Sequence, residues 1–395
     1  MSADTYAAAL TYIASYWPRI IRENTTDRGT LIGLPCPYLV PGDDSAMFQE
    51  MYYWDSYFMA IGVVGTPHAH LVVDMTENMA YLIERFGLIP NASRFYFLSR
   101  SQPPFFTQMI RLAHEVQRAT GSADDSAWRA RMYTLAAQEH EQVWLGTAQP
   151  HHRRVHRGLS RYFDINYLDT LAACESGWDH STRCDERWLE HLPVDLNSIL
   201  YVVERDLAAL ARDLGSPADA ARYEVLAEQR AQTIRELMWD EARGLFCDYD
   251  FVHERRAPDP SLAMFYPLWA GLATQAQADA LIARWLPRFL RRGGLLTTLR
   301  RKTGRQWAAP NGWAPLHWLV VAGLERYGHQ QAATRVMTRW CDTCNDVFAA
   351  TGVFWEKYNV ERGAPHSEEA GLYGSVPGFG WSNGVFADFA RRLGE

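Results

Sequence analysis

The chain has 395 residues, of which 48% are apolar and 13% aromatic, and its formal net charge is −7. This length suffices for one large core or for two domains. No basic stripe follows the sequence, so nucleic acid is not expected as a partner. No apolar run approaches the ~20 residues of a membrane helix, so no membrane-spanning segment is expected. The 15 tryptophans favour a carbohydrate site, since indole faces stack on sugar rings, or else a large helical core.

The first residues and the cysteines bear on the compartment. Residues 1–19 lack the basic segment and the continuous apolar segment of a secretory signal. Among the six cysteines, Cys341 and Cys344 have the spacing of a redox or zinc pair, but no second such pair and no histidine pair accompanies them. We therefore expect structural thiols on a helix, no bound metal and no cofactor, in a cytoplasmic protein whose cysteines are reduced.

Helical periodicity dominates the chain. Apolar residues between 196 and 214 recur at helical spacing, and Gly215 ends the run. Residues 216–219 supply the capping residue, the proline and the acid that begin a helix, and Thr274 with Gln277 has the pattern of a capping box. Further helical patterns cover residues 3–23, 46–63, 69–86, 104–119, 125–145, 260–273, 276–291, 312–327, 329–349 and 381–392.

These patterns predict about twelve helices, separated by loops of unequal length, and hence stacked helical hairpins. The sequence lacks long alternating strands and a βαβ rhythm, which disfavours a parallel α/β architecture. No low-complexity linker divides the chain, so we expect a single domain over residues 1–395. Loops as long as those predicted are usually functional, and they hold nearly every unusual cluster. They cover residues 29–45, 87–104, 146–182, 292–315 and 350–380.

The stretch from Glu175 to Arg183 combines two carboxylates, a glycine, a tryptophan and an arginine. Within it Asp179 follows Trp178, and a carboxyl group beside an aromatic ring loses water, which raises its pKa and lets it hold a proton near neutrality. That property suits a general acid at a glycosidic bond. A Trp–Asp pair alone more often marks a helix end or a surface hydrogen bond, so the motif needs support from elsewhere in the chain.

That support is a second carboxylate motif far downstream. Glu356 stands between Trp355 and Lys357, and an adjacent cation keeps a carboxylate ionised, as a general base requires. Hydrolysis of a glycoside needs such a pair, with a protonated acid on one side of the bond and an ionised carboxylate on the other. The two motifs together predict a glycoside hydrolase.

Aromatic rings and hydrogen-bonding side chains gather in three further stretches. Residues 48–57 place aromatic rings around two acids, as the wall of a sugar pocket or as an amphipathic core helix. Arg100 and Gln102 offer several donors to a ligand, or are simply solvated, in a loop that prolines end. Two tryptophans within residues 306–315 line a pocket or close a core.

Taken together, these motifs resemble the trehalases, inverting hydrolases of α,α-trehalose that form an (α/α)6 barrel. The likeness covers about residues 40–390 and implies the same all-α fold. The matching motifs, in chain order, are Phe48 to Tyr57, Asn91 with Arg100 to Gln102, Glu175 to Asp179, Pro193 to Asn197, Gln306 with Trp307, Pro310 to Pro315, Glu356 to Tyr358, and Gly378 to Gly384.

The resemblance also implies roles for single residues. It makes Asp179 the general acid and Glu356 the general base, and an inverting pair implies carboxyl groups ~6.5–9.5 Å apart. The partner is a small sugar, and the oligomeric state is left open. The residues expected to bind the sugar are Phe48, Tyr52, Trp54, Asp55, Asn91, Arg100, Gln102, Gly177, Trp178, Trp307, Asn311, Trp313, Tyr373 and Trp381.

Four features depart from the trehalase pattern. Met47 replaces an arginine, Ala308 an aspartate and Leu372 a glutamate, and the segment between Tyr162 and Glu175 is short and lacks an Arg-Pro-Glu contact. Each lost contact costs affinity, ~1–3 kcal/mol for a hydrogen bond to a charged group. Trehalose is therefore the first expected substrate, and another α-glucoside, such as a different disaccharide or glucosylglycerate, is the second. The alternatives from other classes are a sugar-binding protein without hydrolysis and a histidine-dependent sugar epimerase.

Overall fold

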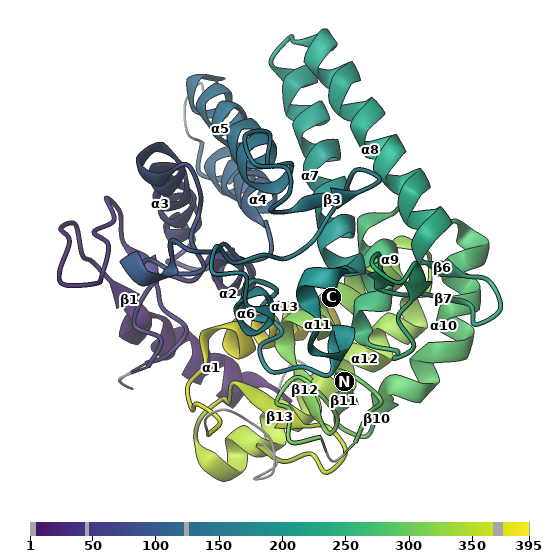
Figure 1. Cartoon of the computed structure of the whole chain (residues 1–395). Coiled ribbons are helices and arrows are strands. Elements are labelled where there is room, and N and C mark those ends of the chain that lie inside the picture. The colour runs from purple at the N-terminus through teal and green to yellow at the C-terminus, as the bar shows by residue number, and fades with distance from the viewer. Residues whose placement is uncertain (1–4, 44–46, 122–125, 302, 366–373, 395) are drawn as a thin grey trace.

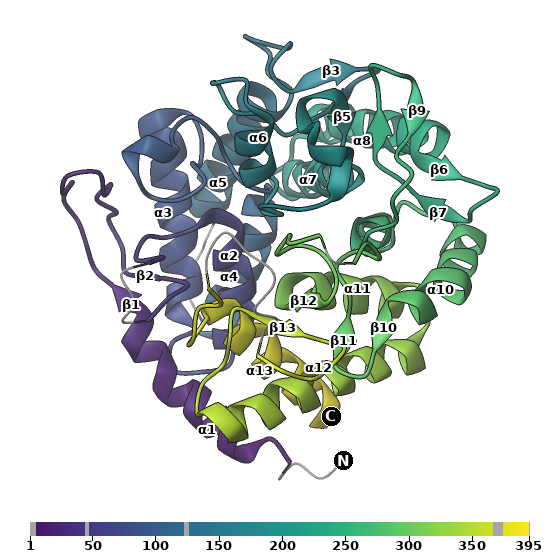
Figure 2. The same ribbon diagram turned by 60° about the horizontal axis from the view of Figure 1, so that its bottom comes forward.

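The structure is a computed structural model, and it describes residues 5–43, 47–121, 126–301, 303–365 and 374–394. Twelve helices form two concentric rings and alternate between them along the chain (Figures 1 and 2). The inner ring consists of α2 (Tyr53–Val63), α4 (Phe106–Ala119), α7 (Val194–Asp213), α9 (Tyr266–Ala270), α11 (Ala314–Arg326) and α13 (Gly380–Gly394). The outer ring consists of α1 (Ala7–Tyr16), α3 (His70–Phe86), α5 (Ser126–Glu139), α8 (Pro217–Met238), α10 (Gln275–Phe289) and α12 (Gln330–Thr351).

Contacts between helices close the inner ring. Each inner helix packs against the next one along the chain, and α13 packs against α2. All of α2 is buried, whereas α4 buries one face, on residues at helical spacing from Phe106 to Val116. This arrangement is the predicted all-α (α/α)6 barrel. Within the described residues, no helix has both the length and the apolar character needed to cross a membrane.

Two glycines bring the backbones of α2 and α13 into direct contact. A Cβ atom on Gly62 would lie 2.4 Å from the Cα atom of Gly384, and one on Gly384 would lie 2.1 Å from the carbonyl oxygen of Phe58. Only a residue without a side chain allows such an approach. Trp54 and Trp381, in the first turns of these two helices, also lie close together, with ring centroids 6.1 Å apart.

Short antiparallel strands tie the connecting loops together. Strand β12 pairs with β13 and joins two loops that lie far apart in sequence, with Trp313 opposite Lys357. The strands are β1 (Ile21–Arg22) with β2 (Tyr38–Leu39), β3 (Arg154–His156) with β4 (Leu159–Ser160), β5 (His191–Leu192) with β8 (Tyr249–Asp250) and β9 (Arg255–Arg256), β6 (Trp239–Asp240) with β7 (Leu245–Phe246), β10 (Leu290–Arg291) with β11 (Gly294–Leu295), and β12 (Asn311–Trp313) with β13 (Lys357–Asn359).

Most helix boundaries follow the sequence patterns, but the helix expected over 46–63 begins only at Tyr53. The residues just before it are not helical because a distant loop takes up backbone groups there. The amide of Met51 donates to Oγ of Ser93, and the amide of Tyr53 donates to the carbonyl oxygen of Asn91. The loop expected over 146–182 also contains a helix, α6 (Asp169–Glu175).

Two other local predictions are confirmed. Thr274 and Gln277 form a capping box at the start of α10, with each side chain bonded to the backbone of the other residue. Cys341 and Cys344 are buried, unpaired thiols on α12, as expected for structural thiols at helical spacing. The CxxC spacing therefore places both side chains in the core between helices.

Candidate active site

A cavity lies at the end of the barrel where the inner helices begin. Trp54 and Asp55 stand in the first turn of α2, Trp381 in the first turn of α13, and Trp313 immediately before α11. Loops from four other parts of the chain complete its wall. The lining residues are Phe48, Tyr52, Trp54, Asp55, Asn91, Gln102, Gly177, Asp179, Trp307, Trp313, Glu356, Phe379 and Trp381.

Asp179 reaches the cavity from the turn that follows α6. The Gln306 side chain donates to its backbone carbonyl oxygen at 3.3 Å, which fixes the turn. The side chain keeps some exposure to the cavity, but the surrounding protein removes most of its water. The pKa of Asp179 is raised to about 7, mainly by this burial, while the positive charge of Arg100 acts to lower it and the charge of Glu356 acts to raise it. A substantial fraction of Asp179 therefore carries a proton at neutral pH.

Arg100 acts on the cavity from behind its wall. Its guanidinium donates to Oδ2 of Asp164 at 3.2 Å and lies 5.0 Å from the ring centroid of Phe97. It is not among the residues that line the cavity, and Asp164 from the short segment before α6 engages it, so its direct contact with a sugar stays a prediction. Its positive charge nevertheless lowers the pKa of Asp179.

Glu356 is the residue just before β13, and it lines the cavity. Its carboxylate lies 2.8 Å from Nζ of Lys357, and both side chains are only 1% exposed. The Trp381 indole donates to the backbone oxygen of Glu356 at 2.9 Å, and the Glu356 amide donates to Val376. Lys357 Nζ also lies 5.2 Å from the Trp313 ring centroid. A buried cation thus accompanies this carboxylate, as the sequence indicated.

Indole rings form much of the cavity wall. Trp307 and Trp313 lie parallel, with ring centroids 3.9 Å apart and planes 1° apart. Trp178 stacks behind Trp307 at 5.6 Å and is itself covered by Arg183, whose guanidinium lies 4.4 Å from the ring. Trp178 therefore supports the wall and does not line the cavity, which differs from its expected role.

A third carboxyl group, that of Asp55, shares the cavity. Gln102 lines the same cavity, and its Oε1 atom accepts from the amide of Trp54 at 3.1 Å. Burial raises the pKa of Asp55 well above its ordinary range, and the nearby charges of Asp179 and Glu356 raise it further. The cavity thus offers three carboxyl groups, those of Asp55, Asp179 and Glu356, to a ligand.

Three other residues remain to be placed relative to the cavity. Asn311 lies behind the wall, where its side chain donates to the backbone oxygen of Gln306 at 3.1 Å. Tyr373 lies outside the described residues. Phe379 lines the cavity but was not among the expected sugar-binding residues. An aromatic residue two positions before Trp381 in a glycine-rich stretch was the available signal.

We expect Gly177→Ala to lower kcat/KM by more than its loss of stability, measured as Tm, would explain. A Cβ atom there would lie 2.7 Å from Cε2 and Cζ2 of Trp54, and the backbone has φ +72°. Left-handed geometry alone costs ~1–2 kcal/mol for a residue with a side chain. Gly215→Ala is the matched control, because its φ is +76° and its Cβ would meet open space. Comparable losses of kcat/KM and Tm in the two variants would contradict a role for the contact with Trp54.

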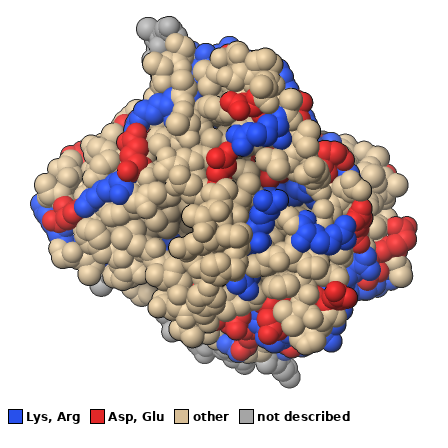
Figure 3. Space-filling model, turned by 45° about the horizontal axis from the view of Figure 1, so that its top comes forward, with Lys and Arg blue, Asp and Glu red and all other residues tan. Residues whose placement is uncertain are grey.

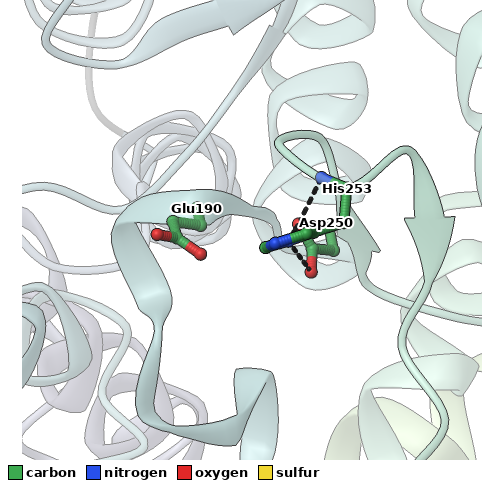
Figure 4. Close-up of side chains that lie close together, drawn as sticks. All are labelled: Glu190, Asp250 and His253. Carbon is green, nitrogen blue, oxygen red and sulfur yellow. Dashed lines mark hydrogen bonds and ion pairs between the residues drawn. The ribbon is translucent and has the colours of Figure 1, made fainter.

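A separate group of titratable side chains lies outside this cavity. Glu190, Asp250 and His253 have potential ligand atoms within 4.8 Å of one another (Figure 4). Arg187 already pairs with both carboxylates, and Arg255 lies 3.4 Å from Asp250. On the face drawn in Figure 3, acidic and basic side chains likewise lie next to one another. Arginines of the chain itself neutralise this cluster, and we assign no ligand to it.

Comparison with known proteins decides the family. The family model described as Trehalase matches residues 2–173 and 164–394. The chain belongs to the trehalase family. A similar member is the periplasmic trehalase of Xanthomonas campestris pv. campestris (strain B100), 36% identical over 412 residues, with 95% of this chain and 71% of the relative covered. The periplasmic trehalase of Pseudomonas aeruginosa is 35% identical over 433 residues, with 97% and 76% covered.

Solved structures of similar proteins support the trehalase assignment. The neutral trehalase Nth1 from Saccharomyces cerevisiae superposes with a TM-score of 0.78 at 26% identity, covering 98% of this chain and 81% of that one. A mannosylglycerate hydrolase from Thermus thermophilus superposes with a TM-score of 0.69, covering 96% and 99%, but at 19% identity it shares the fold alone. As a trehalase-family member, the chain is a glycoside hydrolase with a small sugar as substrate.

The trehalase relatives also correct the expected location. Both are named periplasmic trehalases, which contradicts the cytoplasmic location predicted from residues 1–19 and from the cysteines. The cysteines were a poor guide because four of the six, Cys184, Cys247, Cys341 and Cys344, are buried. A buried, unpaired thiol reflects packing, and it is found in proteins of either compartment.

Proposed function

We propose that this trehalase-family hydrolase cleaves α,α-trehalose with inversion, with Asp179 as the general acid and Glu356 as the general base. The observation that carries the proposal is that both carboxyl groups line one cavity in opposite surroundings. Asp179 keeps its proton in a substantial fraction of molecules near neutral pH because its pKa is raised to about 7, while Glu356 lies against the Lys357 ammonium at 2.8 Å. Two carboxyl groups with such different surroundings match the needs of an inverting glycosidase, which uses one as an acid and the other as a base.

The reaction consumes one water and forms two glucose molecules. The Asp179 carboxyl group gives its proton to the glycosidic oxygen as the bond from that oxygen to the anomeric carbon breaks. The Glu356 carboxylate takes a proton from a water molecule, whose oxygen bonds to the anomeric carbon from the opposite face. That carbon changes from the α to the β configuration. Proton exchange with solvent then restores both side chains, and no metal or organic cofactor takes part.

The cavity wall supports the binding of a sugar unit. The stacked indoles of Trp307 and Trp313 form an apolar part of the wall beside the carboxyl groups. Asn91, Gln102 and Asp55 supply amide and carboxyl groups on the same wall, which suit the alternating donors and acceptors of sugar hydroxyls. We propose that residues 1–395 act as one catalytic unit.

The test is to incubate the protein with α,α-trehalose and to follow the first products by ¹H NMR before the anomers equilibrate. Inversion predicts α-glucose and β-glucose in equal amounts, since one half leaves with its configuration kept and the other is attacked by water. Formation of α-glucose alone would contradict inversion. A panel of other α-glucosides is incubated in parallel, and their hydrolysis without hydrolysis of trehalose would overturn the substrate assignment.

A further inference from the structure

Three buried indoles form one stacked column beside the cavity, called the indole column below. Trp307 stacks on Trp313 with ring centroids 3.9 Å apart and on Trp178 with centroids 5.6 Å apart, so it is the middle ring. Each of the three residues is at most 2% exposed. Trp178 belongs to the turn after α6, whereas the other two belong to the segment that leads into α11. The indole column therefore joins two segments that are far apart in the sequence.

The two ends of the indole column are next to the chain neighbours of the proposed acid and base. At one end, Trp178 directly precedes Asp179. At the other end, Nζ of Lys357, which directly follows Glu356, lies 5.2 Å from the ring centroid of Trp313. Trp313 and Lys357 are also opposite each other in the β12–β13 pair. The column thus runs from the turn that carries one carboxyl group to the strand that adjoins the other.

Backbone contacts hold the middle ring against the turn that carries the acid. The amide of Trp307 donates to the carbonyl oxygen of His180 at 3.4 Å, and Oγ of Ser181 donates to the carbonyl oxygen of Trp307 at 3.4 Å. The Trp313 indole donates to the carbonyl oxygen of Gln306 at 3.2 Å, which fixes the two rings of this segment relative to each other. The three rings are therefore held by hydrogen bonds as well as by stacking.

A buried ion-pair network anchors the acid end of the column. The Arg183 guanidinium lies 4.4 Å from the ring centroid of Trp178 and 5.2 Å from that of Trp188. It donates to the carboxylate of Asp195 at 2.8 and 2.9 Å and to that of Asp248 at 2.7 and 3.1 Å. Asp195 stands in the first turn of α7. The acid end of the column is thus tied to the inner ring of helices.

Stacked rings in a close-packed interior make a stiff spacer. Rings in van der Waals contact cannot approach further, and a packed interior leaves little empty space into which they could shift. An inverting glycosidase must keep its two carboxyl groups far enough apart for a water molecule to fit between substrate and base. A spacer between the chain neighbours of the two groups is suited to fix that distance.

We propose that the indole column sets the separation between the Asp179 and Glu356 carboxyl groups, and that Trp178 is a positioning residue of the hydrolysis. This inference rests on the proposed roles of the two carboxyl groups. The other two indoles of the column line the cavity, whereas Trp178 is not among the lining residues. Substitution of Trp178 therefore removes support from the acid without removing a side chain that lines the sugar cavity.

The experiment compares Trp178→Leu and Trp178→Phe on trehalose and on α-glucosyl fluoride. In Trp178→Leu we expect the acid to shift, so that kcat for trehalose falls by about 10²-fold, the cost of a displacement of ~1 Å at a reacting group, while KM changes little. Hydrolysis of α-glucosyl fluoride should lose far less activity, because fluoride leaves without a proton. Trp178→Phe keeps a ring against Trp307 and should show a smaller loss of the same kind, on trehalose and not on the fluoride.

Trp188→Leu is the matched control. Trp188 is also fully buried and contacts the same guanidinium, but it belongs neither to the indole column nor to the residues that line the cavity. Its substitution should lower Tm, with small and equal effects on the two substrates. Equal losses on trehalose and on the fluoride in both Trp178 variants would overturn the proposal and leave a purely structural role for Trp178.

A second readout does not depend on turnover. Crystal structures of the wild type and the variants give the distance between the two carboxyl groups directly. We expect this distance to change in Trp178→Leu, to change less in Trp178→Phe and to stay the same in Trp188→Leu. An unchanged distance in the Trp178 variants would overturn the proposal. Absence of trehalose hydrolysis by the wild type would instead reject the proposed function, while the crystal structures would still decide whether the column sets the separation.

Discussion

Asp179→Asn is expected to lower kcat for trehalose by about 10²–10⁴-fold, the usual contribution of a general acid or base. An amide has the size of the carboxyl group but cannot deliver a proton to the glycosidic oxygen. The leaving group would then depart as an alkoxide of very high basicity. KM should change little, because the amide keeps hydrogen bonds to the cavity. Steady-state kinetics with glucose detection measure the effect.

A substrate that needs no proton separates the acid role from a folding defect. With α-glucosyl fluoride, fluoride leaves without protonation, so Asp179→Asn should lose far less activity than on trehalose. Asp206→Asn is the matched control, since Asp206 is also a buried carboxyl group with a raised pKa and lies outside the cavity. It should hydrolyse both substrates at near wild-type rates. An equal loss on both substrates in Asp179→Asn would show that Asp179 is not the acid.

The sequence revealed the parts of the site whose chemistry is local. Glu356 and Lys357 are neighbours in the chain and in space, so the ionised partner of the pair was visible from the motif. The same holds for the aromatic residues at the starts of α2 and α13, because helix N-termini of the inner ring converge on one cavity. Helical periodicity predicted stacked helical hairpins, because each helix carries its own pattern, and the resemblance to the trehalases implied that these hairpins close into a barrel.

The parts that the sequence did not show depend on contacts between distant segments. Residues 48–52 have the same apolar spacing as a helix, but Ser93 and Asn91 engage the backbone that a helix would use. Arg100 pairs with Asp164, which is 64 residues away in the chain, and in this position its charge lowers the pKa of Asp179. The spacing of residues along the sequence does not predict which loops contact each other, because these contacts form only when the barrel closes.

Glu356→Ala is expected to lower kcat for trehalose by about 10²–10⁴-fold through loss of the general base. Without the carboxylate, no group in the described cavity wall is placed beside a buried cation to take the proton from water. The shorter side chain also removes a partner of the buried Lys357 ammonium, so Tm should fall as well. Comparison with Glu356→Gln separates the two effects, since glutamine keeps the volume and a hydrogen-bonding group but cannot act as a base.

The space vacated in Glu356→Ala allows a direct test of the geometry. Azide needs no deprotonation, and it should enter this space and attack the anomeric carbon from the side opposite the departing oxygen, while Asp179 still protonates that oxygen. The expected products are β-glucosyl azide and glucose, with a rate that rises with azide concentration, whereas the wild type should form no azide adduct. Formation of α-glucosyl azide would show that the substrate is attacked from the face of the leaving group, which would contradict the assignment of Glu356 as the base of an inverting reaction.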